Sequence, residues 1–597
     1  MLEPLDIKPG IYTEASDRAA LLRWKAGSNV RFFQGWAEKV GGWIKLTATQ
    51  FTGICRAMVS WVSLDDARYV AMGTHKKLYL TDGSAFYDVT PISSSGSLTN
   101  AFATTNTDST VTVTHNAHGR VVGDYVEFLT VANDPVGGLT MVGEWVVATV
   151  PTAGTYTFEH TSTATSSVTV SGGAITYEFQ IAIGLEDTIV GTGFGAGPFG
   201  AGSTDRTIGF VNAARTWSLS NWGEDLIACP RGGKIYTWVE NNGTGTRAVA
   251  ISQAPAQNLL ALVSPEDRQI VSFGAYDSTL GKLDHMLVAW CDSEDYTTWA
   301  AASTNNAGTK RLDRGNEIVT AQVTRSEIII ITDKSVYAMR RSGDDFVFDF
   351  KVEGETIGAM SPNSAVDVDG VVYYMGRGEF MKYDGEVTIL NTEVHSHVFG
   401  NINKLQAAKV FGARNKTKDE IIWFYTSASA TENDKCVGYN YLDDVWWVGT
   451  IARTTWLDEN VLIEEPLASC GDSYLWVHES GNDDNAGALA YSLESYDFEL
   501  PGRLADGYGS GEFVRRLSSI YPDVKRITGS HLITITGKKY PQGESFTKGP
   551  LTLTSADDHI DTHMRARQIS IKIEGTAIGT DIALGQFRVK INNAGRR

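Results

Sequence analysis

The feature that most constrains the fold is a recurring pattern: an apolar strand, a short polar or glycine turn, and a second strand with an aromatic residue among aliphatics. From the third copy onward, successive copies begin 42, 43, 50 and 53 residues apart, close to the roughly 40 to 50 residues of one propeller blade. We therefore predict an all-β protein built around a β-propeller, in preference to a sandwich of hairpins, which the pattern would also fit. The copies lie at 69–83, 226–238, 286–299, 328–339, 371–385, 421–449 and 474–494.

Helical periodicity is limited to two short amphipathic segments. The first is 15–26, with Ser16 as its N-cap, and the second is 400–411. Nearly all of the remaining chain has the pattern of short strands and turns.

Residues 97–180 interrupt the repeat with a different composition, rich in Thr and Val and with almost no Lys. Alternating strands such as the one in 125–131 predict an inserted immunoglobulin-like β-sandwich or a small β-barrel, placed on a propeller loop that tolerates insertions. A glycine-rich segment, 191–202, follows and is expected to be a linker back to the propeller.

The C-terminal portion again alternates polar and apolar residues and concentrates basic ones, which predicts a separate β platform. The expected domains are residues 1–96 as an N-terminal segment and first blade, 97–180 as the inserted β-domain, 181–494 as propeller blades, and 495–597 as the C-terminal β platform.

The charge balance restricts the function. The chain of 597 residues has 51 Lys and Arg against 70 Asp and Glu, a net charge of −19, so general affinity for nucleic acid through phosphate neutralisation is not expected. A role beside DNA that slides without binding remains open. Five scattered cysteines without a CxxC pair indicate reduced thiols, and no segment approaches the roughly 20 apolar residues of a membrane span.

No motif predicts catalysis or a cofactor. The segment 191–202 lacks the GK[ST] of a P-loop, and no GxSxG elbow occurs. His559, His563 and Asp561 are weak metal candidates, because the two histidines are four residues apart, but the glutamate of HExxH is missing and the flanks resemble strands. A solvated acidic turn is the expected structure, and the protein is not expected to be an enzyme.

Aromatic residues and glycines mark the remaining candidate positions. The stretch NVRFFQGWAEKVGGW, residues 29–43, is expected at the entrance to the first repeat, with its rings between blades and its glycines in tight turns. Tryptophans on predicted strands, including Trp238 and Trp423, would fill the wedges between blades more often than they would form a sugar-binding platform. The marked residues are Trp36, Gly41, Gly42, Trp43, Trp217, Trp222, Trp299, Trp446 and Trp447.

Three segments resemble a known family. Residues 11–43, 216–238 and 271–340 are similar to the tail nozzle proteins of short-tailed bacteriophages (podoviruses), also called tail tubular protein B or tail hub. The resemblance implies a propeller-based virion protein that assembles as a homohexameric ring below the adaptor. This ring would close the tail channel before adsorption and then conduct the genome into the host. The resemblance supplies no catalytic residue.

The same resemblance implies partners and a location. The partners would be the tail adaptor, tail fibres or a needle, and genomic DNA that passes without sequence-specific binding. The protein would be made in the host cytoplasm and reside in the virion tail. Acidic turns at 63–66, 342–345 and 441–444 are candidates to line the channel. Adaptor or subunit docking is considered for Arg515, Arg516, Arg565 and Arg567, with scattered solvated strand faces as the equal alternative.

Two other classes of function stay open at this stage. A glycan-binding or glycan-degrading propeller, such as a receptor-binding tail protein, would use exposed tryptophans. An intracellular propeller scaffold is disfavoured by the inserted Thr- and Val-rich domain.

Overall fold

The computed structural model describes residues 2–14, 16, 20, 22–190, 211–266, 268–342, 347–355, 357–499, 514–540 and 542–594. Within this part of the chain the regular secondary structure is almost entirely β-strand, with one short α-helix, α1 (His395–Phe399), and three short 3-10 helices. The all-β prediction is confirmed. None of the described helices is long and apolar enough to cross a membrane. The chain forms two compact units, residues 1–50 with 312–597, and residues 51–311.

The first unit contains four successive four-stranded antiparallel sheets. The first strand of each sheet contacts the first strand of the next. The fourth sheet is completed by β5, a strand from the start of the chain that pairs with β43. The sheets are β29 (Ile318–Val323) to β32 (Phe348–Glu355), β33 (Ala365–Val368) to β36 (Val387–Ile389), β37 (Phe411–Asn415) to β40 (Val445–Gly449), and β41 (Thr455–Leu457) to β43 (Leu475–His478) with β5 (Trp43–Lys45).

The central strands of these sheets are buried on both faces. β30 (Ile328–Thr332) is a run of four isoleucines and a threonine, and β38 (Glu420–Tyr425) has the sequence EIIWFY; every residue of both is buried. A strand covered on both sides needs no alternation of polar and apolar residues. This explains why such runs recur along the sequence.

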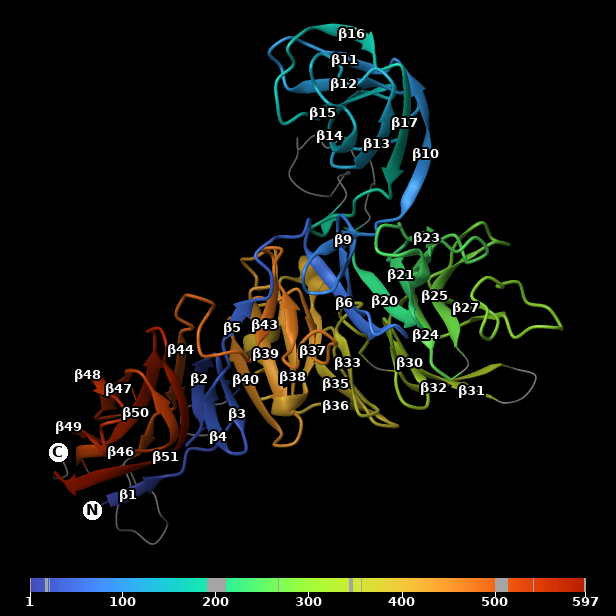
Figure 1. Ribbon diagram of the computed structural model, residues 1–597. Helices are drawn as coiled ribbons and strands as arrows, with labels where there is room; N and C mark the ends of the chain where they lie inside the picture. The colour runs from blue at the N-terminus through green and yellow to red at the C-terminus, as the bar shows by residue number, and fades with distance from the viewer. Residues whose placement is uncertain are drawn as a thin grey trace, which may run out of the picture. The chain divides into compact units, whose positions relative to one another are not determined.

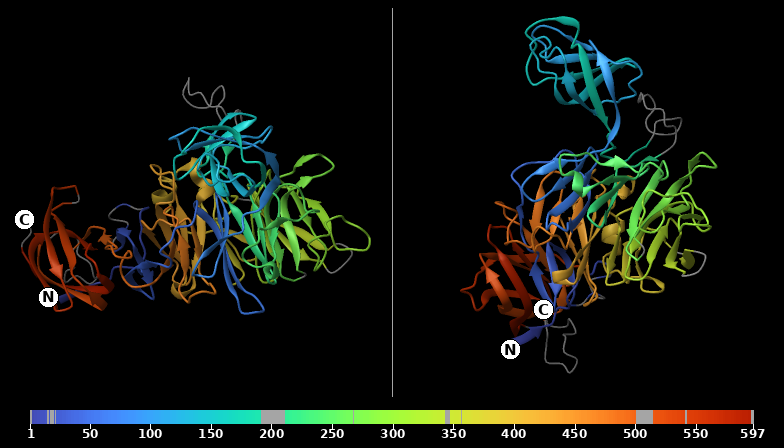
Figure 2. Two further views of the ribbon diagram at one scale, coloured as in Figure 1. Left: turned by 45° about the horizontal axis from the view of Figure 1, so that its top comes forward. Right: turned by 45° about the vertical axis from the view of Figure 1, so that its right-hand side comes forward.

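The first unit also contains a terminal β-domain built from both ends of the chain, as the neighbouring blue and red strands in Figure 1 show. The further views in Figure 2 likewise place the two termini in this domain. One six-stranded sheet has the order β3-β4-β51-β46-β49, with β1 also paired to β51, and the other has the order β2-β44-β50-β47-β48, with β45 also paired to β50. The strands are β1 (Leu2–Leu5), β2 (Trp24–Ser28), β3 (Val30–Phe33), β4 (Trp36–Lys39), β44 (Tyr491–Ser495), β45 (Phe498–Glu499), β46 (Arg515–Thr528), β47 (His531–Lys538), β48 (Ser545–Leu553), β49 (Ile560–Ala566), β50 (Gln568–Gly575) and β51 (Asp581–Asn593).

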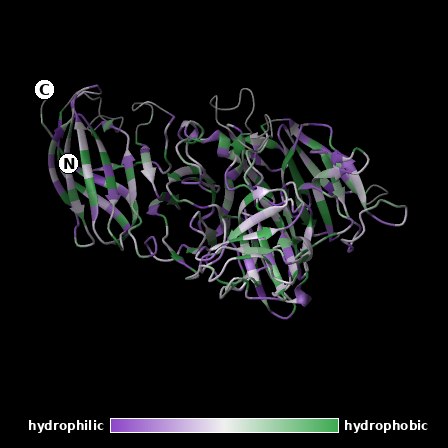
Figure 3. Ribbon diagram, turned by 90° about the horizontal axis from the view of Figure 1, so that it is seen from above, coloured by the Kyte–Doolittle hydropathy of each residue, from purple (hydrophilic) through white to green (hydrophobic). Residues whose placement is uncertain are grey.

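Strict alternation creates the core of the terminal β-domain. Every second residue of β49 is buried, from Ile560 to Ala566, and β47 alternates in the same way. Figure 3 shows the resulting change of hydrophilic and hydrophobic positions along the strands beside the two termini. The apolar side chains join one core that continues into three of the meander sheets of the same unit, those that begin with β33, β37 and β41, and Trp423 and Trp446 belong to it.

Two predictions about the N-terminal region were wrong. Residues 29–43 do not enter a first blade: β3 and β4 form a hairpin that pairs with β51, and Trp43 begins β5 of the last sheet. Of the helix predicted for 15–26, residues 15, 17–19 and 21 lie outside the described residues, and from Trp24 onward the chain is a strand, β2, because it pairs with β44. The second predicted helix, 400–411, contains only a 3-10 segment, η2 (Lys404–Lys409). In the N-terminal region long-range strand pairing outweighed the local pattern.

The second unit contains three further antiparallel meander sheets. In two of them, the copies of the repeat at 69–83 and 226–238 form the hairpins β7–β8 and β21–β22. The copy at 286–299 supplies only one strand, β27. The sheets are β6 (Cys55–Val62), β7 (Arg68–Thr74), β8 (Leu78–Thr81) and β9 (Phe86–Asp88); β20 (Trp217–Trp222), β21 (Asp225–Pro230), β22 (Tyr236–Trp238) and β23 (Val249–Ala250); and β24 (Asn258–Ser264), β25 (Gln269–Asp277), β27 (Leu287–Trp290) and β28 (Gly308–Arg311), with β26 (Lys282–Leu283) paired to β25.

The insertion forms one eight-stranded sheet that curls into a barrel-like domain (Figure 1). It has its own core, which includes Phe102, Phe128 and Phe158. Its first and last strands pair, so the insertion leaves and re-enters the unit at one place. The glycine-rich segment 191–202 lies outside the described residues. The strands are β10 (Ile92–Thr99), β11 (Phe102–Thr104), β12 (Thr110–Thr114), β13 (Tyr125–Val131), β14 (Gly143–Thr152), β15 (Thr155–Glu159), β16 (Val168–Ser171) and β17 (Ala174–Gln180).

Candidate functional site

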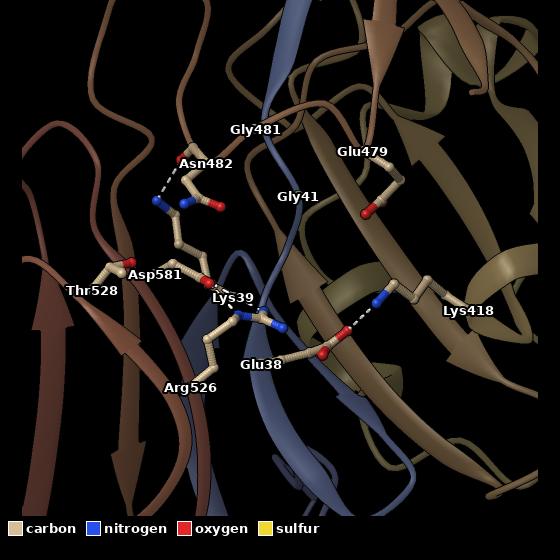
Figure 4. A pocket seen from close by; sticks show the side chains of 10 residues that line it. All are labelled: Glu38, Lys39, Gly41, Lys418, Glu479, Gly481, Asn482, Arg526, Thr528 and Asp581. Carbon is tan, nitrogen blue, oxygen red and sulfur yellow. Dashed lines mark hydrogen bonds and ion pairs between the residues drawn. The ribbon is translucent and has the colours of Figure 1, made fainter. Parts of the chain in front are cut away.

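A polar pocket in the first unit is a concave candidate site. It has a volume of about 390 Å³ and lies where β4, the loop after β43, and the ends of β46 and β51 meet (Figure 4). It therefore borders both the terminal β-domain and two of the meander sheets. Its lining residues are Glu38, Lys39, Gly41, Lys418, Glu479, Gly481, Asn482, Arg526, Thr528 and Asp581.

Each cation that lines the pocket has a partner from another chain segment. The Nζ of Lys418 lies 2.6 Å from Oε1 of Glu38, and Arg526 forms a two-pronged ion pair with Asp581. Lys39 donates from Nζ to the carbonyl oxygens of Asn482 and Thr580, at 2.7 Å each. Burial lowers the pKa of Lys39. The pocket therefore joins segments that are far apart in the sequence.

A buried ion triad adjoins the pocket and shares Glu479 with it. The triad consists of Arg31, Glu420 and Glu479. Arg31 on β3 lies 3.2 Å from Glu420 on β38 and 2.6 Å from Glu479 after β43, measured from guanidinium nitrogen to carboxylate oxygen. Glu420 also accepts hydrogen bonds from Trp447 Nε1 and Asn415 Nδ2, both at 2.9 Å. One guanidinium thus connects three different sheets.

Burial and neighbouring charges shift the pKa values of Glu420 and Arg31 in the triad for different reasons. Burial raises the pKa of Glu420 to about 7, although the charge of Arg31 opposes this shift. Burial alone would lower the pKa of Arg31, but the two carboxylates raise it, so the guanidinium remains charged. One positive charge faces two carboxylates, and the triad can take up a proton near neutral pH.

Gly41 and Gly42 allow the chain to approach this loop closely. A Cβ on Gly42 would lie 2.4 Å from the backbone nitrogen of Asp483, and one on Gly41 would lie 2.4 Å from Glu479 Oε2. Neither glycine has a positive φ, whereas Gly35 does, at +79°. Of these three glycines, the expected role in tight turns therefore fits Gly35 only. At Gly41 and Gly42 a glycine is needed because a side chain would overlap the neighbouring loop.

The ion pairs and hydrogen bonds of the pocket and the triad connect strands from the two chain ends to the meander sheets. Sequence analysis did not single out Arg31, Glu420 or Glu479. A usable signal was present: Glu420 begins an otherwise apolar run, and Arg31 lies between Val30 and Phe32. A charged residue inside a buried run requires a buried partner.

The weak metal candidates lie on and just before β49. His559 Nε2 is 3.7 Å from Asp561, and its ring stacks on Tyr521. His563 Nδ1 is 3.4 Å from a guanidinium nitrogen of Arg516. Within the described part of the chain, no group of three His, Cys, Asp or Glu residues is arranged to hold a metal ion.

The tryptophans considered for a sugar platform lie inside the protein. Trp217 packs on Gly73, where a Cβ would come within 2.5 Å of the indole ring, and donates from Nε1 to Thr74 O. Trp447 packs on Gly438 in the same manner. These rings therefore fill space between strands and sheets. The buried set is Trp217, Trp222, Trp238, Trp423, Trp446 and Trp447.

The other marked tryptophans also make internal contacts. Trp43 donates to Asp484 and has the Arg453 guanidinium 4.7 Å from its ring centre. Trp299 is buried and donates to Tyr296 O. Trp36 is partly exposed on β4.

The four arginines considered for docking separate into two kinds. Arg516 and Arg565 are exposed and lie directly opposite each other on β46 and β49. Arg515 is partly buried, and Arg567 packs over the ring of Tyr540. Only the first two project from one sheet face.

The acidic turns differ in their local roles. Asp444 accepts a hydrogen bond from Tyr439, and Asp443 accepts one from the backbone of Gln34. Leu64 in the turn 63–66 is 90% exposed. Most of the turn 342–345 lies outside the described residues.

Comparisons with known proteins identify no family. No protein-family model matches the chain, and no curated protein matches it.

Proposed function

We propose that this protein is a structural virion protein, the ring-shaped tail nozzle of a short-tailed phage. The observation that carries the proposal is the series of antiparallel meander sheets in the described residues, four in the first unit and three in the second, the last of which is completed by β5 from the start of the chain. In this proposal each of these sheets is a propeller blade, and β5 is the strand that completes the last blade.

The charge distribution supports a conduit for DNA. Residues 312–494, which include the meander sheets of the first unit apart from β5, contain 30 Asp and Glu against 15 Lys and Arg. Acidic surfaces repel the phosphate backbone, so DNA would pass without binding strongly. Identical subunits that join through unlike surfaces close into a ring around such a passage.

The proposed assembly is a homohexamer attached to the tail adaptor. It would carry fibres or a needle, close the channel before adsorption and open during ejection. The protein would be made in the host cytoplasm and would have no turnover chemistry. The alternative, a glycan-binding or glycan-degrading tail protein, loses its main support because the six tryptophans of the supposed platform are buried.

Electron microscopy of the purified full chain with its adaptor tests the proposal. We expect six-fold rings seated on the adaptor, and no release of sugars from host surface polysaccharide. A chain that stays monomeric with the adaptor would contradict the nozzle function. Sugar release would favour the alternative.

A further inference from the structure

One sheet face of the terminal β-domain carries an excess of positive charge. Strands β49, β46 and β51 are neighbours, and their inward residues are buried in the core. The side chains that alternate with these point outward, and four of them are exposed cations. We call this surface the basic face; its cations are Arg516, Arg565, Arg588 and Lys590.

The strand register brings like charges together. Arg516 is directly opposite Arg565 on one side and Asn592 on the other. Cross-strand neighbours have Cβ atoms roughly 5 Å apart, and like charges in such a pair are destabilising. His563 lies beside Arg516 and adds no negative charge. The isolated chain therefore holds an electrostatic repulsion that an acidic partner would relieve.

The basic face contains few carboxylates that could neutralise its cations. Among residues 516–521, 559–566 and 588–592, Asp561 is the one carboxylate. It accepts a hydrogen bond from Ser519, at 2.6 Å. Next to Lys590 in the β1–β51 register is Leu2, which is 49% exposed. The face thus combines several cations with an apolar contact, as protein interfaces do.

Another region of the same unit has the opposite net charge. Residues 514–594 contain 12 Lys and Arg against 7 Asp and Glu, whereas residues 357–494 contain 9 against 21. The two regions therefore carry net charges of complementary sign. A nucleic acid is a poorer partner, because the net charge of the chain is −19 and Asp561 would face the phosphates.

We propose that the basic face docks onto the acidic region, residues 357–494, of a second copy of this chain. The inference rests on the proposed nozzle function and extends it, since a ring of identical subunits needs two unlike, complementary surfaces on each copy. Electrostatic complementarity then sets the orientation of neighbours and accelerates their association.

Sedimentation velocity of the full chain, at 0.05 M and 0.5 M salt, tests this interface. We expect wild type to self-associate at low salt and to dissociate at high salt. The variant R516E/R565E should associate at least about tenfold more weakly. The control K539E/K548E makes the same change in net charge at exposed lysines associated with the other sheet of this domain, and should associate like wild type.

Three results would overturn the inference. These are unchanged association of R516E/R565E, equal loss in both variants, and a wild type that remains monomeric at low salt. If the monomeric wild type bound heparin and R516E/R565E did not, the partner would be a polyanion instead.

The failure of this interface can be told apart from the failure of the nozzle function. Rings of R516E/R565E on the adaptor would retain the nozzle and exclude this contact. Salt-sensitive self-association without rings would retain the contact and count against the nozzle.

Discussion

The barrel-like insertion and the terminal β-domain are both additions to the meander sheets, but they are attached in opposite ways. The barrel is continuous in sequence, residues 92–180, and has a separate core. The terminal β-domain combines residues from both chain ends and shares its core with neighbouring sheets. A domain with its own core can loosen alone, whereas one with a shared core is expected to unfold with its neighbours.

The two attachments also differ in chemistry. At the barrel, Glu127 lies directly opposite both Glu144 and Glu178 in the sheet register. Lys77 contacts Glu144, and Arg247 contacts Glu127, from the meander sheets of the second unit. At the terminal β-domain, apolar packing, close glycine contacts and the buried ion triad act together. The first attachment depends on partly exposed charges and the second mainly on burial.

The largest expected effects come from truncating matched core phenylalanines. Phe587 and Phe158 are both fully buried, in the terminal and barrel cores respectively. Each change to Ala should cost about 3–5 kcal/mol. Hydrogen exchange should accelerate across the first unit in Phe587→Ala, and only within residues 92–180 in Phe158→Ala. Equally local responses would remove the distinction between shared and separate cores.

A close-contact test addresses the attachment of the terminal β-domain. Gly42→Ala should destabilise the protein by about 1–3 kcal/mol, because its Cβ would overlap the backbone of Asp483. Gly245→Ala is the control, since nothing lies within 4 Å of its added Cβ, and it should stay within about 0.5 kcal/mol of wild type. Urea unfolding measures both. Equal stability of the two variants would show that the loop at Asp483 can move to accept the added methyl group without loss of stability.

The ion triad predicts a pH dependence. The pKa of Glu420 is about 7 in the folded protein, against an ordinary value of 4.5. The folded state therefore binds a proton that the unfolded state releases, and stability falls as pH rises from about 4.5 to 7, by about 3 kcal/mol.

Comparing urea unfolding of wild type and Glu420→Gln between pH 4.5 and 8 isolates this effect. The difference in unfolding free energy should change through that window in favour of the variant. Gly245→Ala, which changes no titratable group and whose added Cβ meets nothing within 4 Å, should keep a constant difference from wild type. A constant difference for Glu420→Gln would contradict the raised pKa.

The smallest effect is expected at the barrel. Arg247→Met removes an ion pair to Glu127 and one of 2.7 Å to Asp88, which should weaken the attachment by about 1 kcal/mol. The amide of Ile181, which donates to Pro91 O at the barrel base, should exchange about fivefold faster. High salt should shift wild type in the same direction. Lys282→Met, at an exposed residue, should leave the exchange unchanged.

Local sequence patterns were sufficient to predict where many strands lie, but not which strands pair with each other. The runs at 328–332 and 420–425 were recognisable because they are apolar and short, and the insertion because its composition differs. The copy at 474–494 failed as a hairpin: its first strand pairs with β5, and its second, β44, pairs with β2 and β50. Local patterns could not predict the candidate site for the same reason, since Arg31 and Glu420 are nearly 400 residues apart in the sequence.

By itself, the sequence determined that the chain is all-β, where the insertion begins and ends to within a few residues, and that acidic and basic regions are separated. These properties follow from composition and from a two-residue alternation that acts locally. Only the tertiary structure decided that the first strands complete the last sheets, that Gly41 and Gly42 serve a close contact, and that Arg516 faces Arg565. Strand pairing is set by burial and register between distant segments, and a local pattern carries no record of which segments meet.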